Sequence, residues 1–223
     1  MNTTNRPVLV KTDSVNLEGD LFIPERASGI VIFVHGSGSS RHSSRNKFVA
    51  RMLQEGGLGT LLFDLLTAEE ERVDLMTREH RFDIDLLARR TLGAVEWVAE
   101  QVDTQQQPVG LFGASTGAAA ALIASAEKPE LVKAVVSRGG RPDLAGRALS
   151  QVKAPTLFII GGEDDVVVGL NSKAFAQLPS SLQKDMQIVP GATHLFEEPG
   201  TLEQAAQLAQ SWFRKYLFGP IIE

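Results

Sequence analysis

The sequence predicts an α/β protein built on a mostly parallel, doubly wound sheet of about eight strands. Short apolar runs, typical of strands buried on both faces, alternate with longer segments whose apolar residues recur at helical spacing. The conspicuous polar clusters follow the ends of these strands, where sheets of this class bind ligands. No linker, internal repeat or low-complexity tract interrupts the alternation. We therefore expect a single domain over residues 1–223.

Composition narrows the classes of protein that the chain can belong to. A hydrophobic content of 43% and a charged content of 22% describe an ordinary globular protein. The net charge of −5 argues against a general nucleic-acid binder, and the absence of cysteine excludes disulfides and a thiol nucleophile. Residues 1–7 lack the apolar core of a signal peptide, and no apolar run reaches membrane-spanning length. We expect a cytoplasmic protein without a membrane partner; its oligomeric state is not predicted.

The first half of the chain opens with a predicted hairpin. Two β-prone runs at residues 8–12 and 15–23 are separated by Asp13-Ser14. The apolar run 30–34 predicts a buried strand, which ends in the polar, glycine-rich loop 35–45. A helix that ends at Gly56-Gly57 and a strand at 60–63 follow. Residues 65–81 are strongly charged and predict a surface excursion, and the apolar spacing of residues 84–99 predicts a long amphipathic helix.

The second half repeats the alternation. Further strands are predicted at residues 109–113, 132–136, 156–160 and 186–189, and the apolar stripe over residues 202–216 predicts a closing helix. No insertion between these elements is long enough to form a dedicated cap domain.

The stretch Gly113-Ala114-Ser115-Thr116-Gly117 lies between a predicted strand and a helix rich in alanine. A serine raised on a sharp strand-to-helix turn needs small neighbours, because the backbone approaches closely there. The amino end of the following helix presents free N–H groups and a positive dipole, which favour an oxyanion. This setting predicts that Ser115 is a nucleophile; the alternative is a glycine-rich turn that merely contains a serine.

A serine nucleophile needs a base and a group that orients the base. His194 follows the last predicted strand in a loop, from which an imidazole can reach a neighbouring strand end. The acid is expected after an earlier strand, where Gly161-Gly162 is followed by Glu163, Asp164 and Asp165. Asp164 and Asp165 compete for the role, and either could instead cap the next helix. With four dispersed histidines and no cysteine, a metal site is not expected.

Taken together, four motifs in chain order resemble an α/β-hydrolase of the dienelactone hydrolase-like family. These motifs are His35-Gly36-Ser37-Gly38, Gly113-Ala114-Ser115-Thr116-Gly117, Gly161-Gly162-Glu163-Asp164 and Ala192-Thr193-His194. The resemblance runs from about residue 21 to residue 217 and implies the α/β-hydrolase fold without a lid. One departure concerns the nucleophile, because dienelactone hydrolases proper use cysteine where this chain has Ser115.

The resemblance also implies roles for particular residues. The family spacing selects Asp164 as the acid of a Ser115-His194-Asp164 triad. It implies that the backbone N–H groups of Ser37 and Thr116 form the oxyanion hole, in agreement with their positions beside and after the nucleophile.

Four arginines, Arg41, Arg45, Arg138 and Arg141, lie on loops at the predicted strand ends. They are candidate binding residues for an anionic substrate, because a guanidinium can bind a carboxylate through two hydrogen bonds. The alternative is that they pair with Asp143, Glu197 or Glu198 and hold the loops in place.

The sequence thus predicts a serine-dependent hydrolase of small carboxylic esters or lactones, acting through an acyl-enzyme and without a cofactor. The partner is expected to be a small-molecule substrate. The same triad could serve a thioesterase, an amidase or an acyltransferase, and a non-catalytic binding protein of the same fold is a further alternative.

Overall fold

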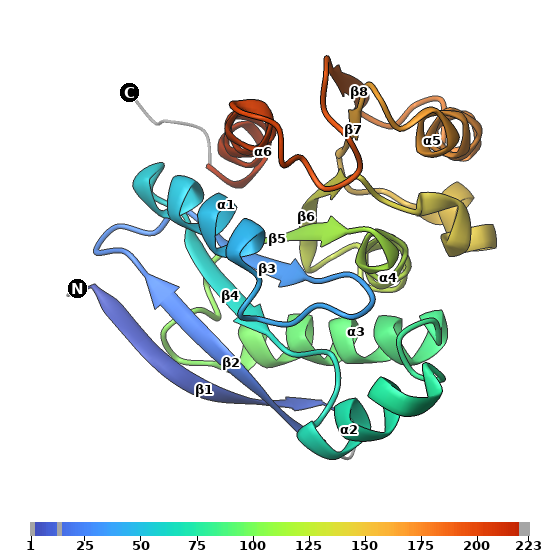
Figure 1. Ribbon diagram of the computed structural model, residues 1–223. Coiled ribbons are helices and arrows are strands. Elements are labelled where there is room, and N and C mark those ends of the chain that lie inside the picture. The colour runs from blue at the N-terminus through green and yellow to red at the C-terminus, as the bar shows by residue number, and fades with distance from the viewer. Residues whose placement is uncertain (1–2, 13–14, 219–223) are drawn as a thin grey trace, which may run out of the picture.

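The computed structural model describes residues 3–12 and 15–218 (Figure 1). In this part of the chain eight strands form one sheet, in the order β1-β2-β4-β3-β5-β6-β7-β8. β1 (Thr4–Thr12) and β2 (Val15–Ile23) pair as an antiparallel hairpin, and β2 is also antiparallel to β4 (Gly59–Phe63). The predicted hairpin is confirmed, although its turn at Asp13-Ser14 lies outside the described residues.

The other strands all run parallel to β4. They are β3 (Ile30–Val34), β5 (Val109–Ala114), β6 (Val132–Arg138), β7 (Thr156–Gly161) and β8 (Lys184–Val189). Every residue of β3, β4, β5 and β7 is buried, because helices cover both faces of the sheet. The predicted mostly parallel, doubly wound sheet is therefore confirmed.

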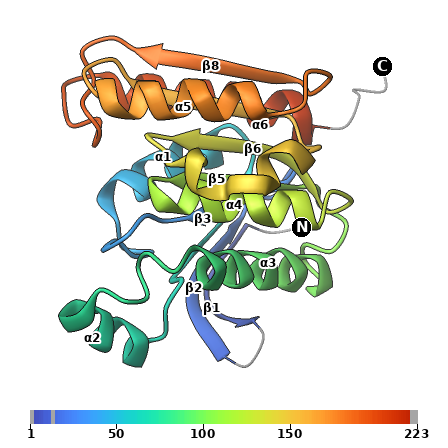
Figure 2. The same cartoon turned by 90° about the vertical axis from the view of Figure 1, so that its right-hand side faces the viewer.

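Two helical layers enclose the sheet (Figures 1 and 2). On one face, α1 (Ser44–Glu55) and α6 (Thr201–Leu217) cover a core that includes Phe33, Phe112 and Phe213. On the other face, α3 (Ile84–Glu100), α4 (Thr116–Glu127) and α5 (Asp165–Gln177) cover a second core around Phe63 and Phe158. No helix in the described ranges combines the length and apolar character needed to cross a membrane.

Two segments differ from the sequence prediction. The expected excursion over residues 65–81 contains a helix, α2 (Ala68–Thr77), which lies at one end of the molecule (Figure 2). A capping box between Thr67 and Glu70 starts this helix. Asp74 is the one residue of α2 whose side chain is buried. A 3₁₀ segment, η1 (Pro142–Gln151), follows β6 and is interrupted at Gly146, where φ is 52°.

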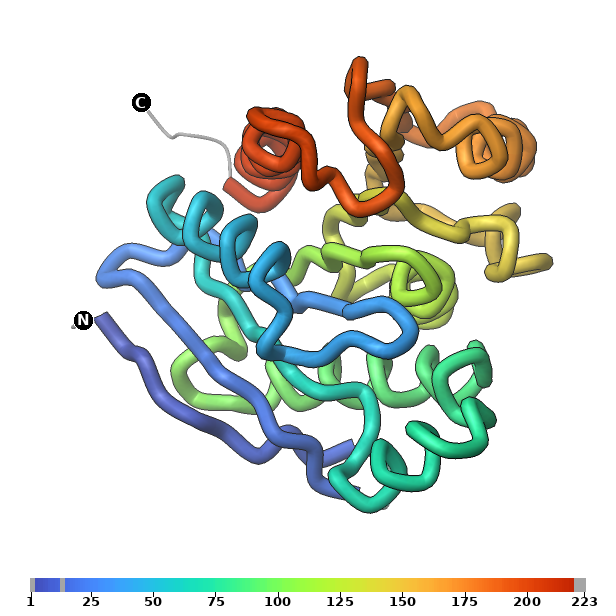
Figure 3. The backbone as a smooth tube through the Cα atoms, in the orientation of Figure 1, coloured from blue at the N-terminus to red at the C-terminus, as the bar shows by residue number. Residues whose placement is uncertain are grey.

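The carboxyl ends of the central strands lie level with one another. Gly113 is opposite Val34 and Ser137, and Ala114 is opposite Arg138. The loops that leave β3, β5, β6, β7 and β8 therefore meet at one end of the sheet, as the tube in Figure 3 traces. Most candidate site residues of the sequence analysis lie on these loops or at these strand ends, but Arg45, expected on the loop after β3, is the second residue of α1, and Thr116 is the first residue of α4.

Candidate active site

Ser115 stands at the turn between β5 and α4 in a strained backbone conformation. Its φ of 50° and ψ of −124° lie in a region that residues other than glycine rarely adopt. Such strain costs of the order of 1–3 kcal/mol and persists where the surrounding structure imposes it. The backbone of β3 leaves no room for a side chain at position 117, since a Cβ on Gly117 would lie 2.1 Å from the Val34 carbonyl oxygen. This is the geometry of a nucleophile elbow.

His194 is held by Asp164. The Nδ1 atom of His194 lies 2.7 Å from Asp164 Oδ2. The other carboxylate oxygen of Asp164 accepts the N–H of Val167 at 3.4 Å and so caps α5. Asp164 thus both contacts His194 and caps α5, whereas Asp165 is the first residue of the helix. With Nδ1 bonded to the carboxylate, Nε2 is the ring nitrogen left to act as a base.

Ser115 and His194 line one cavity of about 230 Å³ at the carboxyl end of the sheet. No hydrogen bond joins Ser115 Oγ to the His194 ring among the described residues, a contact that often tightens only when a substrate binds. Backbone hydrogen bonds hold the Ser115 turn against the end of β6, because the N–H of Ser115 donates to the Arg138 carbonyl and the N–H of Arg141 donates to the Ser115 carbonyl. The nucleophile and the base are therefore presented to the same space.

The two expected oxyanion donors lie side by side, and one of them is already engaged. The backbone N–H of Ser37 donates to the Thr116 hydroxyl at 2.9 Å. The N–H of Thr116 belongs to the first turn of α4, where amides have no acceptor within the helix. Ser37 can serve a substrate oxygen only if the Thr116 hydroxyl shares this amide or turns away from it.

Two further contacts hold the loops around the site. His35 is buried, and its Nε2 accepts the N–H of Leu65 at 3.1 Å while Nδ1 bonds to the Gly36 carbonyl at 3.0 Å. Burial lowers the pKa of His35, which favours the neutral ring. Because both ring nitrogens bond to the backbone, His35 holds the loop in place and is not a second base. Glu198 accepts the N–H and the hydroxyl of Thr193 at 3.0 and 2.6 Å, which fixes the loop that carries His194.

The four candidate arginines have different environments. Arg141 forms a two-pronged pair with Asp143, with distances of 2.9 and 2.8 Å. Arg41 binds Asp64 and Glu18, away from Ser115. Arg45 and Arg138 both line the cavity of Ser115 and His194. The structure therefore brings two of the four arginines to the reactive residues.

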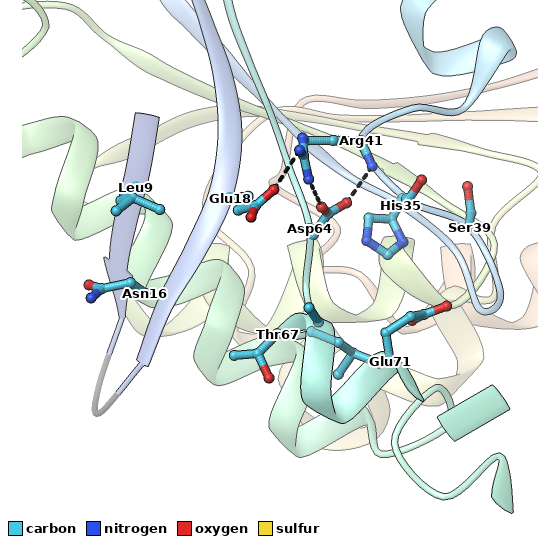
Figure 4. Close-up of a pocket in the computed structure, with 12 residues that line it drawn as sticks. Leu9, Asn16, Glu18, His35, Ser39, Arg41, Asp64, Thr67 and Glu71 are labelled. Atoms are coloured by element: carbon cyan, nitrogen blue, oxygen red, sulfur yellow. Dashed lines mark hydrogen bonds and ion pairs between the residues drawn. The ribbon is translucent and has the colours of Figure 1, made fainter. Parts of the chain in front are cut away.

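A second, larger cavity, of about 400 Å³, lies beside His35 (Figure 4). Its lining includes His35, Arg41, Asp64 and Glu71. Size alone would favour it as the site, but both nitrogens of His35 are engaged, so that ring cannot activate a serine there. The smaller cavity combines the strained serine and the carboxylate-bound histidine, and we take it as the active site.

The sequence analysis did not single out Ser43 and Asn46, which also line the active-site cavity. They start α1, where the Ser43 hydroxyl accepts the N–H of Asn46 at 3.3 Å. The signal available in the sequence was Ser43 itself, because a serine just ahead of an apolar helical stripe is typical of a helix N-cap. Phe196 was also missed; its ring lies 5.6 Å from the Arg138 guanidinium carbon.

The strand order, the elbow and the histidine–aspartate pair define an α/β-hydrolase. The family model of the dienelactone hydrolase family matches residues 17–220, and the chain belongs to that family. A solved dienelactone hydrolase of Anabaena variabilis is 56% identical with a TM-score of 0.94, over 97% of this chain and 99% of that chain.

Two further proteins are similar to this chain, one in sequence and one in fold. A protein of Mycobacterium tuberculosis whose name proposes a phosphoribosyl transferase is 57% identical over 96% of this chain. The match covers 47% of that protein, so this chain spans about half the length of the curated relative. The esterase Est1E of Butyrivibrio proteoclasticus shares the fold, with 15% identity and a TM-score of 0.76 over 94% of this chain and 98% of that chain.

Proposed function

We propose that this chain hydrolyses small carboxylic esters or lactones through an acyl-enzyme on Ser115. The observation that carries the proposal is the strained Ser115 in one cavity with a histidine whose Nδ1 is bound by Asp164. Membership of the dienelactone hydrolase family supports a hydrolase. The transferase name of the mycobacterial relative belongs to a protein about twice as long, and this chain matches the hydrolase family over almost its whole length.

In the proposed reaction, Ser115 Oγ attacks the carbonyl carbon while His194 Nε2 takes the serine proton. Asp164 keeps the ring in the productive tautomer and stabilises the imidazolium. The N–H groups of Thr116 and Ser37 bind the oxyanion, the latter once the Thr116 hydroxyl gives it up. Collapse of the tetrahedral intermediate returns the proton to the leaving alcohol, and water releases the acid by the same steps in reverse order.

The test uses p-nitrophenyl acetate, a small neutral ester, with wild-type protein and the Ser115→Ala variant. Removal of the nucleophile is expected to lower kcat by about 10⁴–10⁶-fold without unfolding the protein. A fluorophosphonate probe should label Ser115 in wild type, as located by peptide mass spectrometry. Ser172→Ala, on the exposed side of α5, is the matched control and should keep full activity. Activity of Ser115→Ala within tenfold of wild type, or labelling at another residue, contradicts the proposal.

The same preparation decides which acyl derivative is cleaved. A matched ester, thioester and amide of one short acyl group should rank with the ester first by kcat/KM. A higher kcat/KM for the thioester or the amide reassigns the activity to that class, with the triad unchanged.

A further inference from the structure

Arg138 is a buried cation that has no anionic partner within residues 3–12 and 15–218. It is 7% exposed at the carboxyl end of β6, and its Nε and Nη1 have no hydrogen-bond partner among the described residues. Burial, reinforced by repulsion from Arg45, lowers the pKa of Arg138 to about 10. The side chain is therefore still charged at neutral pH. Charges in protein interiors are normally paired, because burying one alone is costly.

The amino end of α1 faces the same cavity. Ser43, Arg45 and Asn46 line it, and the first turn of this 12-residue helix contains no acidic residue. The Ser43 hydroxyl accepts the N–H of Asn46, whereas the N–H groups of Ser44 and Arg45 have no acceptor among the described residues, and the helix dipole makes this end positive. Asn46 is 3% exposed, and its Oδ1 has no partner among the described residues.

Arg45 adds a second cation at the mouth of the cavity. Its Nη1 lies 3.2 Å from Glu197 Oε1, and the Glu197 side chain is 63% exposed. A surface pair of this kind is weak, because water and salt screen it. Arg45 can therefore exchange Glu197 for an anion in the cavity at little cost.

The number and direction of these groups select the anion. Arg138 lines the cavity from the end of β6, while Arg45, Asn46 and the first turn of α1 line it from a different element. A planar carboxylate uses two oxygens, whereas a phosphate offers three to donors that converge from several directions. The cavity of about 230 Å³ equals roughly eight water molecules at ~30 Å³ each, so the whole ligand is small.

We propose that Arg138, Arg45 and the amino end of α1 form a phosphate-binding subsite beside Ser115, and that the ester cleaved there carries a phosphate group. The substrate part of this inference rests on the proposed hydrolase function. The subsite itself does not, because phosphate can bind whether or not Ser115 reacts.

Binding is measured first in Ser115→Ala protein, by calorimetric titration with inorganic phosphate against sodium chloride of equal ionic strength. Phosphate should bind, and adding Arg138→Met should weaken binding at least about tenfold, as expected for lost hydrogen bonds to a charged group. Arg45→Gln should weaken it severalfold. Arg147→Gln, which removes one exposed arginine of η1, is the matched control and should leave the affinity unchanged.

Thermal unfolding separates loss of the subsite from loss of the fold. Without phosphate, Arg138→Met should melt no lower than the parent protein, because an uncompensated buried charge has been replaced by an apolar chain of similar length. Phosphate should raise the Tm of the parent and not that of Arg138→Met. If Arg138→Met does not fold, Arg45→Gln carries the test alone.

Phosphate should also inhibit wild-type hydrolysis of p-nitrophenyl acetate competitively, with an inhibition constant that matches its Kd. Ester hydrolysis without phosphate binding overturns the subsite and leaves the proposed function standing. Phosphate binding without any hydrolysis supports the subsite and overturns the hydrolase. Binding of acetate or malonate in preference to phosphate, with the same dependence on Arg138, overturns the assignment to phosphate.

Discussion

The active-site cavity and the larger cavity beside His35 are both lined by the loop that follows β3. Each is also lined by an arginine that is mostly buried. Arg41, on the wall of the larger cavity, binds Asp64 and Glu18, the latter at 2.6 Å (Figure 4), and Asp20 lies 3.7 Å from it. In the smaller cavity, Arg138 has a phenyl ring and a second cation as neighbours. The comparison of Arg41 with Arg138 shows that burial of a guanidinium does not by itself indicate its role. A buried arginine that is paired with carboxylates is structural, whereas one without a carboxylate partner is a candidate for binding an anion.

The pKa values of the two guanidinium groups express the same difference. Burial acts to lower the pKa of Arg41, but the hydrogen bonds and charges of Asp64 and Glu18 outweigh it and raise the value above the ordinary one. For Arg138 burial is unopposed, and the pKa falls. Four predictions test this contrast, beginning with the largest effect.

The contrast between the two cavities depends on ester hydrolysis taking place in the cavity of Arg138. Substitution of Asp164, the proposed triad acid in that cavity, tests this first. Asp164→Asn should lower kcat about 10⁴-fold, because the imidazolium loses its counter-charge and the ring its orientation. Asparagine is also a good N-cap, so the start of α5 should survive. Asp165→Asn and Glu163→Gln should each stay within a few fold of wild type. The opposite ranking in steady-state kinetics would move the acid to the neighbouring residue.

Stability should respond with opposite signs at the two arginines. Arg41→Met leaves Asp64 and Glu18 without their partner and should lower the free energy of unfolding by about 1–3 kcal/mol. Arg138→Met should cost nothing and could add up to about 2 kcal/mol. Denaturant titrations of both variants against wild type make the comparison. Equal losses at the two positions would show that Arg138 has an internal partner.

Substrate preference should depend on one arginine only. Wild type should favour a small ester that bears an anionic group over its neutral isostere, and Arg138→Met should reduce that ratio of kcat/KM about tenfold. Arg41→Met should leave the ratio unchanged even where the protein is less stable. A wild-type preference for the neutral ester, unaltered by Arg138→Met, would make Arg138 a structural residue.

The smallest effect concerns His35, on the wall of the larger cavity. The folded protein keeps this ring neutral, because burial lowers its pKa below the unfolded value of about 6.5. Its contribution to stability is thus complete above that pH and declines as the pH falls below it, because the unfolded chain then binds the proton more readily than the folded one. Unfolding free energies of wild type and His35→Gln over this range should diverge in slope. Parallel slopes would mean that His35 takes up a proton while folded.

Much of the fold followed from local pattern. Continuous apolar runs mark strands buried between two helical layers, so β3, β5 and β7 were predictable within one or two residues. The helix α2 was not, because it lacks an apolar stripe and depends instead on its capping box and on Arg90, which pairs with Glu70 at 2.8 Å. The segment η1 escaped for a similar reason, since a kink at Gly146 breaks its period.

For the site, spacing pointed to Ser115, Asp164 and His194, each of which follows a recognisable strand. The roles of the arginines were not predictable in that way. Arg41 meets Asp64 only because β3 and β4 are neighbours in the sheet. Arg138 lies at the end of β6, where no acceptor in the described part of the chain bonds to its Nε or Nη1. Pairing of charges is a tertiary property that residue spacing does not encode.

The conformation of Ser115 has a consequence for how such a chain changes over generations. Glycine would occupy the same φ without strain, so Ser115→Gly should yield a dead protein that folds at least as well as the active one. Selection for folding alone would therefore not preserve the serine.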